Sequence, residues 1–242
     1  MKLLAFDTST EVMSIAVGHG GQVWQHTGAG GAQASSTLIP AIQSLMAQAG
    51  LQFEQLDVIA FGRGPGSFTG LRTACSVAQG LAFGASAKLL PGASGRSEVK
   101  VLPIDTLLAV AEEARHQHGA TSVLAMLDAR MDEIYLSSYE FDSAMWRHDG
   151  GFGLIRPESL EAKPGWALAG NVFAAYGARL PQGMPCLAAL PTATAMLRLA
   201  PALMAAGQAV PADQALPLYI RDKVAKTTDE RAAERAALSP PS

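Results

Sequence analysis

Two short segments of the sequence carry residues that can contact a phosphate group. The first is Asp7-Thr8-Ser9-Thr10, which follows an apolar run, so its carboxylate and hydroxyls can hold a hydrated Mg²⁺ and a phosphate. The second, residues 62–70, reads GRGPGSFTG and lies between an apolar run and a helical pattern. Glycines placed there let backbone amides turn toward an anion at the start of a helix. The candidate phosphate contacts are Asp7, Thr8, Ser9, Gly64, Gly66 and Ser67.

Each segment also has a purely structural interpretation. Asp7 can cap the turn that follows it, and on the residues alone this interpretation is favoured. The glycines of residues 62–70 can let the turn form and the next helix pack closely, with Ser67 or Thr69 as its N-cap. This segment lacks the Gly-Lys-Ser/Thr ending of a P-loop, and it misses the GxSxG pattern of a serine hydrolase by one residue. The residues alone do not distinguish between phosphate binding and close packing as the role of this segment.

The rest of the sequence offers no catalytic or metal-binding pattern. The five histidines form no HExxH motif, and Cys75 and Cys186 stand far apart without a CxxC pair. Asp128, Asp132 and Glu133 are a candidate acid cluster, but solvated acids are ordinary in a turn between two strands. We therefore predict no catalytic residue and no metal ligand.

Composition narrows the class of protein. The chain has 242 residues, 49% of them hydrophobic, which is enough apolar material for a sizeable core. Its net charge of −3 argues against a surface dominated by nucleic-acid binding, so a partner is expected to make most of any RNA contact. Asp7 interrupts the first apolar run too early for a signal peptide, and no run approaches the ~18 apolar residues of a membrane span. These features favour a cytoplasmic protein with no membrane contact.

The hydrophobic pattern predicts the order β-β-β-α-β-α for the first part of the chain. Strands are expected at residues 3–6, 12–17, 22–26 and 57–61. The first helix is expected behind Ser35 or Ser36 as N-cap and should stop at Gly50, and the second should run to about Phe83. One side of the second helix carries only small residues, because they recur there at every fourth position of the sequence. That side is either core packing, which the residues alone favour, or an association face.

The second part of the chain repeats the pattern after a loop predicted at residues 88–100. Strands are expected at residues 101–104, 122–127 and 133–141, and helices at 106–118 and 193–206, the last one kinked at Pro201. Residues 144–191 are rich in Gly and Pro and give weak signals. The small, charged, Pro-ended segment from residue 227 predicts a disordered tail.

Four segments together resemble the TsaB family, formerly called YeaZ. They are residues 4–10, 62–72, 78–82 and 127–135, and residues 218–225 are similar to the family's C-terminal signature. The resemblance implies a two-lobed α/β fold of the actin, hexokinase and Hsp70 type, a degenerate ASKHA fold with ribonuclease-H-like lobes. The first lobe would comprise residues 1–100, completed by a helix at about 192–208. Residues 101–191 would form the second lobe, and 209–242 a C-terminal segment.

The family resemblance also implies a function without chemistry of its own. It implies that the chain is a dimerisation subunit, which binds and activates a transferase. That transferase places a threonylcarbamoyl group on N6 of the adenosine next to the tRNA anticodon. Expected partners are therefore a TsaD-like transferase and a TsaE-like P-loop ATPase, with tRNA contacted indirectly and a homodimer formed by the chain alone. The old peptidase M22-like label of the broader family is not supported by any residue pattern here.

The resemblance implies that the candidate phosphate contacts are vestigial residues of a nucleotide-binding site. No cofactor is expected, apart from a weak or interface-shared ATP or ADP with Mg²⁺ in the complex. The implied partner interface comprises Leu38, Ile42, Leu45, Gly70, Arg72, Ala74 and Ala78. Residues 32–36 depart from relatives that often carry a histidine there, and the loop around 91–100 resembles an insertion.

Two other functions compete with that of a partner subunit. One is a nucleotide-binding ATPase or small-molecule kinase of the actin and hexokinase type, which would use Asp7 and residues 64–70. The other is direct tRNA binding through Arg221, Lys223 and Lys226, which would make the affinity depend steeply on salt.

Overall fold

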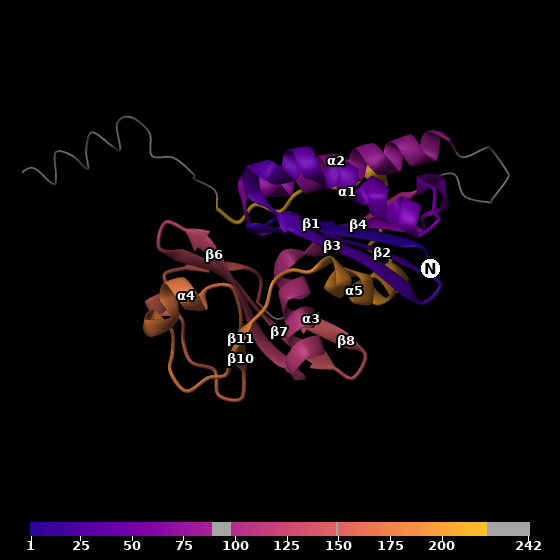
Figure 1. Cartoon of the computed structure of the whole chain (residues 1–242). Coiled ribbons are helices and arrows are strands. Elements are labelled where there is room, and N and C mark those ends of the chain that lie inside the picture. Colours follow the sequence, from indigo (N-terminus) through magenta and orange to yellow (C-terminus); the bar gives the residue numbers. More distant parts are fainter. Residues whose placement is uncertain (89–97, 149, 222–242) are drawn as a thin grey trace, which may run out of the picture.

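The computed structural model describes residues 1–88, 98–148 and 150–221, and in it helices and two sheets alternate as layers (Figure 1). Helices α1 (Ala34–Gln48) and α2 (Phe68–Ala87) cover the outer face of the first sheet. Helices α3 (Thr106–His118) and α5 (Ala193–Ala205) lie between the two sheets. Across the described residues, no helix is long and apolar enough to cross a membrane.

The first sheet has the strand order β3-β2-β1-β4-β5. Its strands are β1 (Leu3–Asp7), β2 (Val12–His19), β3 (Gln22–Ala29), β4 (Val58–Gly64) and β5 (Lys100–Asp105). The predicted antiparallel meander of β1, β2 and β3 is confirmed, and β4 and β5 add to it in parallel. The strand that we predicted to begin the second lobe is β5, and that placement was wrong. Because α2 crosses back over the sheet, β5 pairs with β4 instead, with Ala60 opposite Leu102.

Side chains of the central strands alternate between two cores. Leu4 and Phe6 point to the core under α1 and α2, whereas Leu3 and Ala5 point to the core that holds α3 and α5. Every residue of α3 from Thr106 to Ala114 is buried, as expected for a helix enclosed by sheets on both sides. Since α5 packs on β1 and β2 and also on α3, the two lobes share this central core.

The helix ends agree in part with the sequence. Gly50 follows α1 with φ of +64°, so the predicted stop is confirmed. The predicted N-caps Ser35 and Ser36 were wrong, because a 3₁₀ turn at Gly31–Gln33 leads straight into α1 and the helix begins at Ala34. Ser67 does cap α2, and its side chain accepts a hydrogen bond from the Gly70 amide.

The second sheet has the order β11-β10-β6-β7-β8, with β9 paired to β7. Its strands are β6 (Ser122–Arg130), β7 (Glu133–Asp142), β8 (Met145–His148), β9 (Gly153–Ile155), β10 (Ala167–Gly170) and β11 (Cys186–Ala188). The four strands after β7 were missed because they have only three or four residues each, among many Gly and Pro residues. A short helix, α4 (Phe173–Tyr176), lies beside this sheet. Most of the predicted loop at 88–100 and the predicted tail from 227 lie outside the described residues.

Candidate functional site

A cleft of about 650 Å³ lies between the two lobes, where the sequence places its phosphate-binding candidates. The first lobe contributes Ser9, Thr10, Glu11, Gly66 and Ser67 to its lining, and the second lobe contributes Asp128, Arg130 and Asn171. Residues 218–221, from the C-terminal segment, also line the cleft. The cleft therefore gathers residues from both lobes and from the C-terminal segment.

Asp7 is sealed off beneath this cleft. Its side chain is fully buried and does not line the cleft. The Oδ1 atom accepts hydrogen bonds from the Ser9 amide at 2.8 Å and from the Ser9 hydroxyl at 2.6 Å, whereas Oδ2 has no partner among the described residues. Burial raises the pKa of Asp7 to about 6, although the two bonds from Ser9 oppose this rise. A hydrated metal ion in the cleft would not reach this carboxylate, so the geometry favours the predicted turn over a metal site.

The glycine segment packs against the turn that follows β1. A Cβ atom on Gly70 would lie 1.9 Å from the Thr8 carbonyl oxygen, and one on Gly66 would lie 2.7 Å from the Ser9 carbonyl oxygen. The Thr8 hydroxyl donates to the Gly70 carbonyl at 2.7 Å, and the Ser67 amide donates to the Ser9 carbonyl at 2.8 Å. Because the chain itself fills the space beside these glycines, the structure favours close packing over a phosphate cradle.

The three candidate acids of the β6–β7 hairpin have separate partners. Asp132 pairs with Arg179, and Glu133 pairs with Arg221 at 2.6 Å. Asp128 accepts hydrogen bonds from the Arg130 amide and from the Tyr176 hydroxyl. These contacts fit the predicted turn, although β6 extends into it as far as Arg130. In the described part of the chain, no group of three or more His, Cys, Asp or Glu side chains is placed to hold a metal ion.

Most of the implied interface residues are in the chain's own core. Leu38, Ile42, Leu45, Ala74 and Ala78 are buried and pack in one cluster with residues of the first sheet. Gly70 is buried as well, against the turn after β1. The side chains of these five residues face the sheet, so they offer no surface to a partner. The prediction that they form an interface was wrong, and the alternative of core packing was right. Only Arg72 of the set is exposed.

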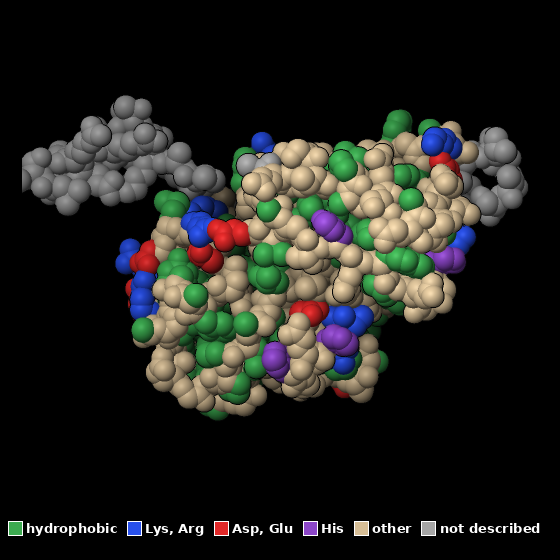
Figure 2. Space-filling model, viewed as in Figure 1, with side chains coloured by type: hydrophobic (Ala, Val, Ile, Leu, Met, Phe, Trp, Pro, Cys, Tyr) green, Lys and Arg blue, Asp and Glu red, His purple; other side chains and the backbone are tan. Residues whose placement is uncertain are grey.

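The opposite sides of α1 and α2 form an exposed surface that we call the outer helix face. Its residues are Ile39, Pro40, Gln43 and Ala47 of α1 and Thr69, Arg72, Ser76, Gly80, Phe83 and Gly84 of α2. Arg72 is the one charged residue in the two helices. In Figure 2 the surface over α1 is mostly tan and green, whereas charged side chains gather over the second lobe. The signal that could have found this face is a second run of small residues four apart, Ser76, Gly80 and Gly84.

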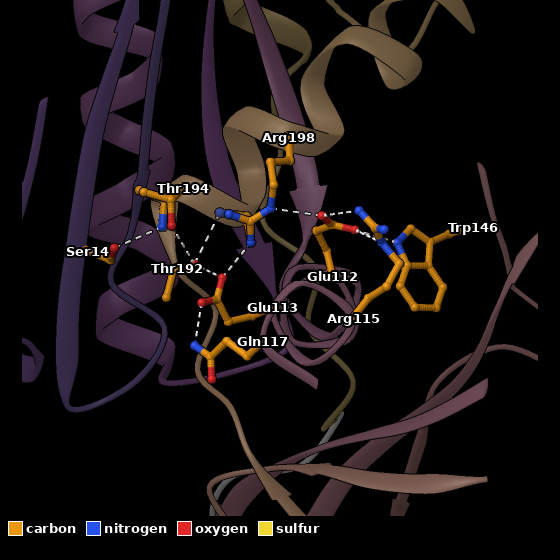
Figure 3. Close-up of polar contacts among 11 residues, drawn as sticks. Ser14, Glu112, Glu113, Arg115, Gln117, Trp146, Thr192, Thr194 and Arg198 are labelled. Carbon is orange, nitrogen blue, oxygen red and sulfur yellow. Dashed lines mark hydrogen bonds and ion pairs between the residues drawn. The ribbon is translucent and has the colours of Figure 1, made fainter. Parts of the chain in front are cut away.

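A buried cluster of charges, which we call the α3–α5 clasp, joins the two inner helices (Figure 3). Arg198 of α5 donates to Glu112 at 2.8 Å and to Glu113 at 2.6 Å, and both glutamates belong to α3. Glu112 also accepts from Arg115 and from Trp146 of β8, and Glu113 accepts from Thr192. Sequence analysis missed the clasp, and the signal that could have found it is the pair of acids inside the apolar run of α3.

The clasp keeps both glutamates ionised. Burial acts to raise the pKa of Glu112, but hydrogen bonds from Arg115, Trp146 and Arg198 outweigh it and hold the pKa below its usual value. Burial acts in the same way on Glu113, and donors including Thr192 and Arg198 again lower its pKa. The clasp therefore fixes charged groups between the lobes and away from the cleft.

Comparisons with known proteins place the chain in a family. It is 32% identical to the tRNA threonylcarbamoyladenosine biosynthesis protein TsaB of Escherichia coli strain K12, over 93% of this chain and 96% of the relative. The corresponding protein of Haemophilus influenzae is 33% identical over 93% of this chain and 95% of its own length. The chain belongs to the TsaB family. Residues 31–148 also match the family model of TsaD, described as a tRNA N6-adenosine threonylcarbamoyltransferase.

A solved TsaB-family structure agrees with the fold. YeaZ from Pseudomonas aeruginosa superposes with a TM-score of 0.79 at 38% identity, covering 90% of this chain and 99% of the other. The two-lobed α/β fold class implied by the resemblance is therefore confirmed. Of the cations considered for tRNA binding in this TsaB-family chain, Arg221 is engaged by Glu133, and Lys223 and Lys226 lie outside the described residues.

Proposed function

We propose that this protein is a non-catalytic subunit in the biosynthesis of threonylcarbamoyladenosine in tRNA, and that it binds a TsaD-like transferase through the outer helix face. The observation that carries the proposal is this face, which is exposed, nearly uncharged and lined by small side chains. The names of its relatives support the pathway. The burial of Asp7 supports the absence of chemistry.

The match to the transferase model supports the choice of partner. It covers α1 and α2, so the transferase is expected to carry a similar pair of helices. Two related chains can pair equivalent faces about a pseudo-twofold axis, as identical chains do about a true one. The same face would then form a homodimer when the partner is absent. A TsaE-like ATPase would join the heterodimer, and tRNA would be bound mainly by the partners.

Gly80→Arg is expected to abolish the complex without harming the fold. Gly80 is exposed in the middle of α2, and a Cβ atom there would meet nothing within 4 Å. Arginine is also a better helix former than glycine, so α2 should not be weakened. We expect size-exclusion chromatography with light scattering to give a 1:1 complex of the wild type with its own organism's transferase at micromolar concentrations, and no complex for the variant.

The matched control is Ala175→Arg, which places the same side chain on an exposed helical residue of the second lobe. It should bind like the wild type. A Gly80→Arg variant that still forms the complex would contradict docking on the outer helix face. Ala74→Arg would be a poor probe, because Ala74 is fully buried and the variant would fail through misfolding.

The proposed subunit needs no cofactor of its own, and any ATP or ADP with Mg²⁺ would be bound weakly or shared at the interface of the complex. We expect calorimetric titration of the chain alone with MgATP to give no saturable binding up to about 1 mM, a limit equivalent to about −4 kcal/mol. Asp7→Ala should leave this result unchanged. Saturable binding that Asp7→Ala abolishes would instead support the competing ATPase or kinase.

A further inference from the structure

The C-terminal segment Leu218–Arg221 lines the cleft and contacts both lobes. On the first lobe, the Leu218 amide donates to the Arg63 carbonyl at 2.7 Å. Tyr219 accepts a hydrogen bond from Arg72 at 3.2 Å and stacks at a tilt on Phe68, with ring centroids 5.3 Å apart. All four residues of the segment line the cleft. The segment is therefore anchored at the end of β4 and the start of α2.

On the second lobe, Arg221 binds the tip of the β6–β7 hairpin. Its side chain is 13% exposed and pairs with Glu133 at 2.6 Å. The same guanidinium donates to the carbonyl oxygens of Ala129 at 3.2 Å and Arg130 at 3.4 Å. A planar guanidinium can satisfy several acceptors at once, which a lysine ammonium does with less geometric definition.

The hairpin tip held by Arg221 has an unfavourable backbone. Arg130, Met131 and Asp132 have φ angles of 60°, 54° and 65°, in the left-handed region that non-glycine residues rarely adopt. Such conformations are unfavourable and persist only where surrounding contacts enforce them. In this hairpin the largely buried guanidinium of Arg221 supplies such contacts, whereas Arg179 pairs with Asp132 at the surface.

The hairpin tip in turn reaches the first lobe. The Arg130 guanidinium pairs with Glu11, which lies in the turn between β1 and β2. Both side chains are largely exposed, at 66% and 78%, so the pair by itself contributes little to stability. The pair joins the hairpin tip to the first lobe, and both of its residues line the cleft. The C-terminal segment, the hairpin tip and the β1–β2 turn therefore surround the cleft with a continuous chain of contacts.

We propose that Leu218–Arg221 is a strap that holds the interlobe cleft closed by fixing the left-handed hairpin tip Arg130–Asp132 against the first lobe. Arg221 is the positioning residue of this device. Leu218 anchors it at the end of β4, and Tyr219 anchors it at the start of α2. Because the strap is part of the chain itself, closure of the cleft would need no external ligand. The proposal does not depend on the partner that the outer helix face binds.

Hydrogen exchange measured by mass spectrometry on the full chain tests the strap. Arg221→Ala removes the charge-assisted bonds to the hairpin, which lets the tip relax and release Glu11. We expect exchange roughly tenfold faster in peptides covering residues 128–134, and also in the first lobe at residues 8–14 and 63–72. Peptides of α3 should be unchanged. Arg221→Lys keeps a charge opposite Glu133 and should give an intermediate increase.

Arg147→Ala is the matched control, because Arg147 also pairs with an acid in the second sheet, Asp142, but does not line the cleft. It should leave exchange at residues 8–14 and 63–72 unchanged. Faster exchange confined to residues 128–134 and 218–221 would overturn the proposal, since the segment would then only pack on the second lobe. Unchanged exchange throughout would overturn it too. If Arg221→Ala does not fold, the comparison is made with Arg221→Lys under the same criteria.

Discussion

Arg198→Ala is expected to lower the free energy of unfolding by about 3–5 kcal/mol, because it removes one partner of a buried ion cluster. Glu112 and Glu113 have side chains only 3% and 8% exposed. Without Arg198, Glu113 keeps the neutral donors Thr192 and Gln117, and Glu112 keeps Arg115. Urea unfolding followed by circular dichroism measures the loss.

Arg179→Ala is the control for this prediction. Arg179 also pairs with two acids, Asp132 and Glu158, but these side chains are 53% and 48% exposed. Exposed pairs contribute about 0–1 kcal/mol, so the loss should be several times smaller. Equal losses for the two variants would show that burial of the clasp is not decisive. Since the pKa of each clasp glutamate is lowered from 4.5, the clasp should stabilise the fold above about pH 4.5 and weaken as pH falls through the lowered pKa values.

Asp7→Asn is expected to remove a pH dependence of the opposite sign. The folded-state pKa of Asp7 is raised from 3.8 to about 6, so the protonated carboxyl favours folding. This contribution is fully present below pH 3.8 and is lost as pH rises through about 6. Between pH 5 and pH 8 the wild type should therefore lose about 1.4 kcal/mol more stability than the variant, one pH unit being worth 1.36 kcal/mol.

The measurement for Asp7 is urea unfolding of both proteins at pH 5 and pH 8, with Asp213→Asn as the control because Asp213 is exposed. For each protein, only the change in the free energy of unfolding between pH 5 and pH 8 is compared. A constant cost of burying the asparagine amide therefore cancels. An equal change in the free energy of unfolding between pH 5 and pH 8 for wild type and Asp7→Asn would contradict the prediction. It would show that the Asp7 carboxyl is not protonated preferentially in the folded state.

The sequence was sufficient where local pattern decides the structure. The meander of β1, β2 and β3 follows from short apolar runs with tight links, and α3 has the predicted bounds of residues 106–118. The sequence was insufficient where the pairing of strands that are distant along the chain decides the structure. The order of elements along the chain does not say which sheet a parallel strand joins, so β5 was assigned to the wrong lobe.

The site could be predicted less well than the fold, for a related reason. A row of small residues on one side of a helix indicates that another element packs closely against it. It does not indicate whether that element is a sheet of the same chain or part of another protein. Ala74 and Ala78 therefore fitted both interpretations, and the resemblance moved them to the wrong one. The contact between Arg221 and Glu133 joins residues 88 positions apart, and no local pattern predicts it.

The near absence of charge on the outer helix face has a kinetic consequence for any partner that docks there. With Arg72 as the one ionic group of α1 and α2, long-range attraction adds little to the encounter rate. Association would then proceed at the unsteered rate of about 10⁵–10⁶ M⁻¹s⁻¹ and would change little with ionic strength. Discrimination between partners would rest on the contour of two helix surfaces, which salt does not screen.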